Sequence, residues 1–137
     1  MVTVLLVITT ILWGTAPIIE KTGLAKVDPL SGLTIRSSVV TVGLLVITFI
    51  MGRGKALMSV DGKGFFLFAL SGLTAGLLAM WTYYSALKIG ATSKVVPIAA
   101  CYPLFTALLS ALILREGVTL PRLAGTALIV SGIWLVK

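Results

Sequence analysis

The chain has 137 residues, of which 58% are hydrophobic and only 11% are charged, and its mean hydropathy is +1.14. Soluble domains average roughly 25% charged residues and expose too much surface at this size to carry so apolar a composition, so a soluble globular class is excluded. The formal net charge is +7, but the basic residues lie in short clusters between apolar runs, which indicates anionic lipid head groups and not a nucleic acid.

Five apolar runs predict five membrane-spanning helices, because a spanning helix needs about 20 mostly apolar residues. The first run ends before Glu20 and Lys21 and lacks the flanks of a signal peptide, so we expect a retained helix. Asp28 and Pro29 then restart the chain as a second helix. In chain order, the predicted helices cover residues 2–19, 30–51, 64–87, 93–114 and 120–136, with a polar loop from Gly52 to Lys63.

This layout predicts an all-α integral membrane protein with a single, multi-pass transmembrane domain over residues 1–137. We expect it to lie in the inner (plasma) membrane of the cell. A β-barrel would show alternating segments of about ten residues, and the long uncharged runs do not fit that pattern. The chain has no histidine and a single cysteine, Cys101, so we expect no metal site, no cofactor and no disulfide framework.

Apart from Arg36, basic residues are divided equally between the two sides of the predicted membrane domain. One side carries Arg53, Lys55, Lys63, Arg115 and Arg122, and the other carries Lys21, Lys26, Lys88, Lys94 and Lys137. Because the asymmetry of Lys and Arg sets the orientation of a membrane protein, equal numbers leave two alternatives open. Either a few well-placed charges still decide one orientation, or copies insert both ways, which is dual topology.

Several short motifs follow one another in a characteristic order along nearly the whole chain. They are Leu12-Trp13-Gly14 with Pro17, the stretch Tyr84–Ser93, Val96-Pro97-Ile98, Tyr102-Pro103-Leu104-Phe105-Thr106, Leu114-Arg115-Glu116 and the stretch Gly125–Gly132. Together they resemble one repeat of an EamA-type transporter of the drug/metabolite transporter superfamily. Members typically have ten helices built from two repeats, so this chain resembles the short, single-repeat members. The resemblance implies a secondary transporter or facilitator of a small metabolite, amino-acid-like or another small organic solute.

An odd number of helices has a consequence for assembly. When a five-helix repeat is duplicated in tandem, the second copy inserts upside down and the pocket forms between the inverted halves. A single repeat builds the same pocket only with a second copy in the opposite orientation. We therefore predict an antiparallel homodimer with the pocket at the dimer interface. A parallel homodimer and pairing with a related chain remain alternatives.

Other functions also stay open from the sequence alone. A lipid-carrier flippase needs a lateral opening to the bilayer, and a non-transporting membrane assembly subunit needs no pocket. An enzyme is not expected, because no pair of nucleophile and base is evident in the sequence.

Arg36 is the only charged residue well inside an apolar run. An arginine in a membrane is costly and points to a function, so Arg36 is a candidate substrate contact. The alternative is that it reaches the nearby interface or pairs with Glu20 or Asp28 on the same side. Small multidrug-resistance relatives carry an essential Glu at a place that Gly14 occupies here, which argues against proton-coupled export of lipophilic cations.

Two faces of small residues predict the walls of a cavity, with close helix packing as the alternative for both. One face, in the fourth predicted helix, holds Ala99, Ala100, Pro103, Ala107, Ser110 and Ala111, where Pro97 and Pro103 free backbone carbonyls. The other, in the third helix, holds Gly72, Ala75, Gly76, Ala79, Tyr83 and Ala86. Tyr83 is the preferred aromatic residue for the cavity, whereas Trp81 and Tyr84 are assigned to an aromatic belt at the interface. The predicted substrate-binding residues are Trp13, Gly14, Arg36, Tyr83, Pro97, Tyr102 and Pro103.

Two glycines in the last predicted helix indicate a dimer contact. Gly125 and Gly132 are seven residues apart, so they uncover a strip of backbone along roughly two turns. Small residues let helices approach closely in lipid, and small multidrug-resistance proteins resemble this chain in that spacing. We predict that Gly125 and Gly132 lie at the dimer interface; the alternative is that the same strip packs within the monomer.

Overall fold

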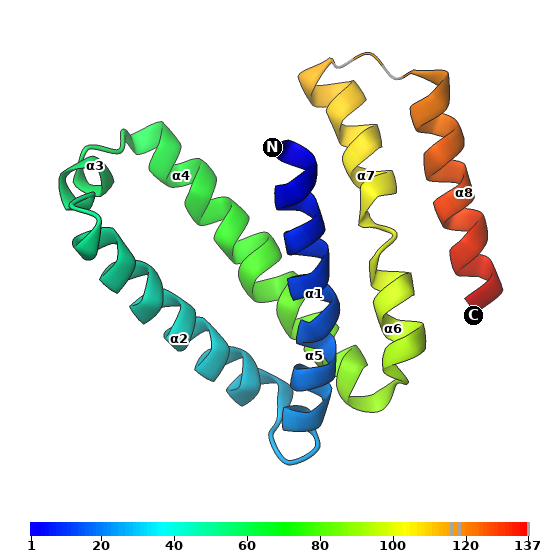
Figure 1. Ribbon diagram of the computed structural model, residues 1–137, viewed down its shortest axis with the longest axis horizontal. Helices are drawn as coiled ribbons and strands as arrows, with labels where there is room; N and C mark the ends of the chain where they lie inside the picture. Colours follow the sequence, from blue (N-terminus) through cyan, green and yellow to red (C-terminus); the bar gives the residue numbers. More distant parts are fainter. Residues whose placement is uncertain (116, 118, 137) are drawn as a thin grey trace. The chain divides into compact units, whose positions relative to one another are not determined.

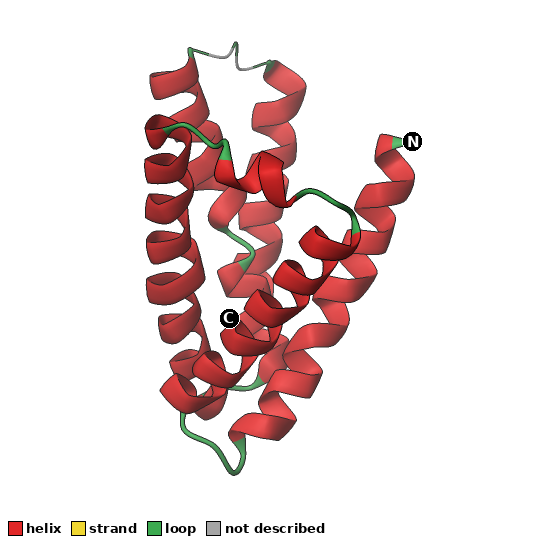
Figure 2. Cartoon of the chain, turned by 90° about the vertical axis from the view of Figure 1, so that its left-hand side faces the viewer, coloured by secondary structure: helices red, strands yellow, loops and turns green. Residues whose placement is uncertain are grey.

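The computed structural model describes residues 1–115, 117 and 119–136, with Arg122 and Val136 described by their backbone alone. Helices joined by short loops make up this part of the chain, and it contains no strand (Figure 2). Four helices are long and apolar enough to cross a membrane, and a fifth apolar helix is shorter. The all-α membrane fold class is therefore confirmed. Glu116, Lys137 and the side chain of Arg122, which entered the predicted loops and interfaces, lie outside the described residues.

The structure divides into two compact units, Met1–Lys88 and Ile89–Lys137. Unit 1 begins with α1 (Val2–Leu24) and α2 (Pro29–Ile50). Asp28 caps α2, because its side chain accepts a 3.0 Å hydrogen bond from the backbone N–H of Ser31 and Pro29 occupies the first helical position. Hydrogen bonding with Ser31 also holds the pKa of the Asp28 carboxyl below its ordinary value.

Helix α1 extends further than the sequence predicts. The predicted helix ends at residue 19, but α1 continues to Leu24 and includes both Glu20 and Lys21. These charged side chains do not end the helix because both contact other helices of unit 1. Pro17 also lies inside α1 without ending it.

The connection from α2 to the third long helix contains a short helix, α3 (Gly54–Met58), where the sequence predicts only a polar loop. Gly52 turns the chain before it with a φ of 65°, a conformation that glycine adopts without steric cost. The long helix then consists of α4 (Gly62–Ser71), the π-helical segment η1 (Gly72–Ala79) and α5 (Met80–Ile89). Asp61 caps its start by accepting a hydrogen bond from the N–H of Gly64.

Segment η1 changes the side-chain register of this helix. A π-helix closes its hydrogen bonds over five residues and not four, so residues after it turn to a different face from the one that an α-helix predicts. The small-residue face from Gly72 to Ala86 assumed a regular α-helix. It therefore does not continue unchanged through η1 to Tyr83.

Unit 2 contains α6 (Thr92–Ala99), α7 (Tyr102–Leu109), the π-helical segment η2 (Ser110–Leu114) and α8 (Leu120–Val136). The fourth predicted helix is thus broken at Ala100 and Cys101, and the chain resumes its helix at Tyr102, one residue before Pro103 (Figure 1). Proline has no backbone N–H and clashes with the carbonyl four residues earlier, which accounts for a break at this place. Helix α8 contacts both α6 and α7.

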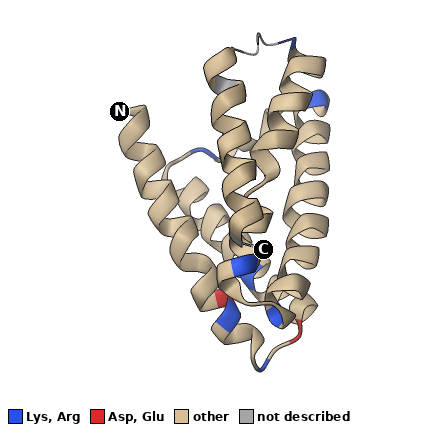
Figure 3. Cartoon of the chain, turned by 90° about the vertical axis from the view of Figure 1, so that its right-hand side faces the viewer, with Lys and Arg blue, Asp and Glu red and all other residues tan. Residues whose placement is uncertain are grey.

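Nearly all apolar side chains of the described chain are exposed in the isolated molecule. The buried hydrophobic residues are Leu24, Leu33, Tyr84 and Leu87, all in unit 1. Apart from Arg36, which lies about two turns inside α2, the described charged residues gather at helix ends and in loops (Figure 3). This distribution is expected for helices whose apolar sides face lipid.

Candidate functional site

Three polar side chains from three helices of unit 1 meet near the loop between α1 and α2. Oε1 of Glu20 in α1 accepts a 2.8 Å hydrogen bond from the hydroxyl of Tyr84 in α5. The same oxygen lies 3.5 Å from Nε of Arg36 in α2. We refer to Glu20, Arg36 and Tyr84 as the Glu20 cluster. The cluster connects α1, α2 and α5 through a single carboxylate oxygen.

Apolar packing holds the tyrosine of this cluster in place. Tyr84 is only 3% exposed, and the buried side chains of Leu24, Leu33 and Leu87 belong to the same small core. A Cβ added to Gly32 would lie 3.6 Å from the Tyr84 ring, so α2 passes close to α5 here. Because the ring is packed on these sides, its hydroxyl presents a fixed donor to Glu20.

Two lysines bind backbone carbonyls at the same end of unit 1. Nζ of Lys21 donates to the carbonyl oxygens of Leu87 and Lys88, at 2.7 Å and 3.0 Å. Nζ of Lys88 donates to the carbonyl of Val27 at 2.8 Å. Positive groups near the last carbonyls of a helix are favoured by the helix dipole. The lysines therefore fasten the end of α5 to α1 and to the loop that follows α1.

The structure tests what the sequence predicted for Arg36, Tyr84 and Tyr83. Arg36 pairs with Glu20, as in the alternative that the sequence offered to a substrate contact, and the substrate contact itself stays a prediction. Tyr84 was assigned to an aromatic belt, and that assignment is wrong because its ring is buried and its hydroxyl binds Glu20. Tyr83, the preferred cavity residue, is half-buried with its ring centroid 6.3 Å from that of Tyr84.

Sequence reasoning named Glu20 only as an alternative partner of Arg36 and missed Tyr84 as a member of a site. Glu20 was treated as the end of a helix, and Tyr84 as a residue of the interface. The signal that could have found them is their position: both lie at helix ends that the predicted topology places on the same side of the membrane as Arg36.

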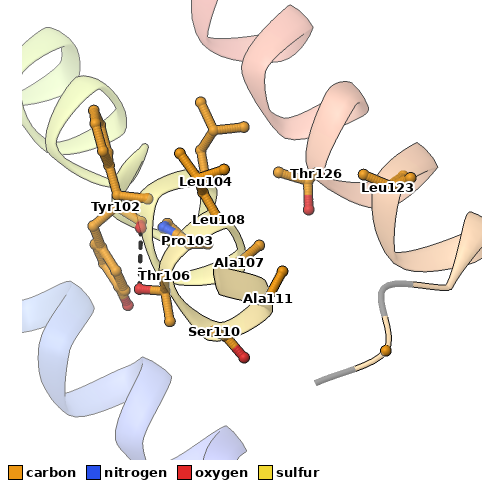
Figure 4. Close-up of a pocket in the computed structure, with 12 residues that line it drawn as sticks. Tyr102, Pro103, Leu104, Thr106, Ala107, Leu108, Ser110, Ala111, Leu123 and Thr126 are labelled. Atoms are coloured by element: carbon orange, nitrogen blue, oxygen red, sulfur yellow. Dashed lines mark hydrogen bonds between the residues drawn. The ribbon is translucent and has the colours of Figure 1, made fainter. Parts of the chain in front are cut away.

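A groove lies in unit 2 between the broken fourth helix and α8, with a volume of about 560 Å³. Figure 4 shows Ala107 and Ala111 on the side that faces Leu123 and Thr126 of α8. The described residues that line it are Tyr102, Pro103, Leu104, Phe105, Thr106, Ala107, Leu108, Ser110, Ala111, Gly117, Leu123 and Thr126. Tyr102 and Pro103 were predicted as substrate-binding residues, and the structure places both in this lining.

The lining of the groove is mostly hydrocarbon with a few hydroxyl groups. Thr106 donates through Oγ1 to the carbonyl of Tyr102 at 3.2 Å, a bond drawn in Figure 4. Ser110 and Thr126 supply further hydroxyls, and no charged residue is among the described lining residues. A groove of this kind suits the apolar body of a small solute, with a few hydrogen bonds to orient it.

The remaining predicted residues lie outside this groove. Trp13 and Gly14 are in α1 of unit 1, where Trp13 is 66% exposed and a Cβ on Gly14 would meet no described atom within 4 Å. Pro97 lies inside α6, one turn before the break, and does not line the groove. A Cβ on Gly125 or on Gly132 would likewise meet no described atom within 4 Å. The glycine strip of α8 is therefore open within the described chain.

Comparison with known proteins gives one family and two relatives. The sequence model of the EamA-like transporter family matches residues 1–137. An uncharacterized protein of Methanocaldococcus jannaschii is 32% identical over 96 residues, which cover 70% of this chain and 69% of the relative. An "uncharacterized transporter in cobO 3'region" of Sinorhizobium is 28% identical over 116 residues, covering 84% of this chain and 81% of the relative. Each alignment covers nearly the same fraction of this chain as of the relative, so both relatives are close to this chain in length. No solved structure matches the chain.

Proposed function

This chain belongs to the EamA-like transporter family, and we propose that it carries a small organic solute across the inner (plasma) membrane as an antiparallel homodimer. Family membership and the apolar helices make it an integral membrane transporter of the drug/metabolite type. EamA is a family of transporters, which is consistent with a protein that is not an enzyme. The solute and the assembly are the proposed part.

The groove between α7 and α8 is the observation that carries the proposal. It combines apolar walls with the hydroxyls of Thr106, Ser110 and Thr126 and offers about 560 Å³, within the range of roughly 300 to 1,000 Å³ typical of small-molecule sites. It lies beside a discontinuous helix, and broken helices line the binding sites of many secondary transporters. An amino-acid-like molecule or another small organic solute suits this volume and lining.

The single family domain and the loop charge support the pairing of two inverted copies. One family domain covers the whole chain, and two relatives have similar lengths. Loop cations are equally numerous on the two predicted sides, as dual topology requires. The open strip at Gly125 and Gly132 supplies a surface through which two copies of α8 could approach closely.

The proposal is tested by transport itself. The purified protein is reconstituted in liposomes and supplied with an isotope-labelled mixture of small metabolites, and the lumen is analysed after washing. We expect one chemical class of solute to accumulate above protein-free liposomes, and the same class to change in cells that lack the protein. Movement of a lipid-linked carrier without any solute uptake would instead favour the flippase alternative. Neither activity, from a well-folded protein, would favour an assembly subunit.

A further inference from the structure

We propose that the guanidinium of Arg36 binds the carboxylate group of the transported solute, and that Glu20 and Tyr84 are positioning residues for it. The proposal rests on the proposed transport function and adds the chemical class of the solute. Four observations carry it: the contacts of Glu20, the burial of Tyr84, the outer edge of Arg36 and the local balance of charge.

Glu20 contacts the guanidinium of Arg36 only at its Nε edge. Its Oε1 lies 3.5 Å from Nε of Arg36, which is a single contact and not the two parallel hydrogen bonds of a forked arginine–carboxylate pair. The Glu20 side chain is 13% exposed and that of Arg36 is 46% exposed. Glu20 therefore fixes the inner edge of the guanidinium, while the outer part of the side chain remains accessible.

The position of Glu20 is itself fixed by Tyr84. The tyrosine hydroxyl donates to the same Oε1 at 2.8 Å, from a ring that is almost completely buried. A carboxylate with a buried donor keeps one orientation more readily than one in water. Tyr84 thus orients Glu20, and Glu20 orients Arg36, across three different helices.

The outer end of the Arg36 guanidinium has hydrogen-bond donors that bind no described residue. Its terminal nitrogens, Nη1 and Nη2, donate no hydrogen bond to any residue that the structure describes. A guanidinium presents its donors as a planar fork that matches the two oxygens of a carboxylate. A solute carboxylate can therefore take this end-on fork without displacing Glu20 from Nε.

The surroundings of the cluster favour an anion. The neighbouring ends of α1, α2 and α5 and the loop between α1 and α2 contain four basic residues, Lys21, Lys26, Arg36 and Lys88, against two acidic ones, Glu20 and Asp28. Asp28 is engaged as the cap of α2. The excess of positive charge offsets the repulsion that Glu20 exerts on an incoming anion.

A singly charged carboxylate fits this site better than a phosphate monoester does. A phosphate monoester carries about −1.5 to −2 charges at neutral pH, and the single guanidinium of Arg36 does not balance that charge. Lipid head groups share the oxyanion chemistry and must be distinguished. Arg36 lies seven residues after Pro29, about 10 Å along the axis of α2. That depth favours a solute in the transport path over a head group at the surface.

The test measures binding to the full chain, purified in a neutral detergent, by titration calorimetry. The probes are hexanoate, its uncharged analogue hexanamide, and dihexanoylphosphatidylglycerol as a soluble lipid head group. We expect hexanoate to bind and hexanamide to bind much more weakly. Arg36→Lys should weaken hexanoate binding about tenfold, as expected for the loss of one charge-assisted hydrogen bond. Arg53→Lys is the matched control on the loop after α2 and should bind as the unchanged protein does.

Glu20 provides the test of positioning. Glu20→Gln and Glu20→Ala both remove the negative charge, but only the glutamine keeps an oxygen that accepts from Tyr84 and Arg36. Hexanoate should therefore bind Glu20→Gln at least as well as the unchanged protein and bind Glu20→Ala more weakly. Equal binding of hexanoate by the two variants would show that Glu20 does not position Arg36. It would overturn the proposed positioning role of Glu20.

The outcomes separate the site from the transport function. Equal binding of hexanoate and hexanamide, or full binding by Arg36→Lys, overturns the carboxylate site. Arg36-dependent binding of the phosphatidylglycerol probe in preference to hexanoate assigns the site to head groups and overturns it as well. Uptake of an uncharged solute class by liposomes would overturn the carboxylate site while supporting transport. Carboxylate binding with no uptake of any solute would leave the site intact and overturn the transport function.

Discussion

The hydroxyl of Tyr84 donates a 2.8 Å hydrogen bond to a carboxylate oxygen of Glu20, 64 residues earlier in the chain. This bond connects α5 with α1, and the ion pair of Glu20 with Arg36 adds α2. Because the ring of Tyr84 is also part of the small core with Leu24, Leu33 and Leu87, the bond joins the polar and apolar contacts of unit 1. Its removal should therefore be measurable in both stability and function.

Tyr84→Phe should lower the stability of unit 1 while keeping its packing. The substitution removes one hydrogen bond to a charged acceptor, which typically contributes about 1.5 to 3 kcal/mol. Thermal unfolding in detergent, followed by circular dichroism, measures the change. Tyr83→Phe is the control, because the hydroxyl of Tyr83 makes no hydrogen bond to a described residue. Equal loss of stability in the two variants would contradict a specific role for the Tyr84 hydroxyl.

A cysteine at Met58 should be labelled from both sides of the membrane. Met58 is 90% exposed at the end of α3, between two membrane-capable helices, so a membrane-impermeant maleimide reaches it. The experiment uses Met58→Cys in a Cys101→Ala background, with Val39→Cys in the middle part of α2 as the unlabelled control. Labelling from one side only would exclude dual topology and leave a parallel dimer or a related partner chain.

Ala107→Leu should reduce transport by filling the groove. Ala107 lines it on α7 opposite Leu123 and Thr126, and three added carbon atoms occupy space that a solute would need (Figure 4). Ala127→Leu is the matched control, because Ala127 is an exposed residue of α8 that does not line the groove. Uptake into liposomes at equal protein content should fall about tenfold or more for Ala107→Leu, if the leucine removes at least 1.4 kcal/mol of solute binding. The same uptake by both variants would mean that solutes do not pass through this groove.

Gly125→Leu and Gly132→Leu should convert dimers to monomers. A Cβ at either glycine meets no described atom within 4 Å, so the described chain leaves open space where the new side chain would begin. It would, however, prevent close approach of a second α8 and cost about 1 to 3 kcal/mol by overpacking. Crosslinking in membranes measures the oligomer, and Gly43→Leu, which also has open space, serves as the control. Persistent dimers in both α8 variants would place the contact on another surface.

The sequence predicted the framework of the fold because apolar length and charge are local signals. The restart at Asp28 and Pro29 and the shorter last helix follow from residues at the place itself. Pro103, Ala107, Ser110 and Ala111 of the predicted small-residue face line the groove, and so does Tyr102, which was predicted separately as a substrate-binding residue. Local chemistry was sufficient for these features. The break before Pro103 was not predicted, since the apolar run from 93 to 114 was taken as one helix.

The Glu20 cluster could not be predicted in the same way, because it depends on which helix ends meet. Glu20 and Lys21 looked like the end of a spanning helix, since unpaired charges favour water. Only contacts with Arg36, Tyr84 and the carbonyls of α5 explain why α1 continues past them. The π-helical segment η1 was missed for a related reason: Gly72–Ala79 holds no proline or charge, and its two glycines were interpreted as part of a small-residue face of an ordinary helix.

The side-chain hydrogen bonds and the ion pair that join α1, α2, α5 and the loop after α1, among the residues described, are all at the end where α1 turns into α2. These interactions hold the helices together at one end, and no such interaction among the described residues joins their opposite ends. Each helix is therefore restrained mainly at its bonded end. Helix α2 is 22 residues long, about 33 Å. A tilt of about 10° at the fastened end would displace its far end by about 6 Å over that length. A small rearrangement around Glu20 would thereby be enlarged into a movement about the width of a small solute at the far end of α2.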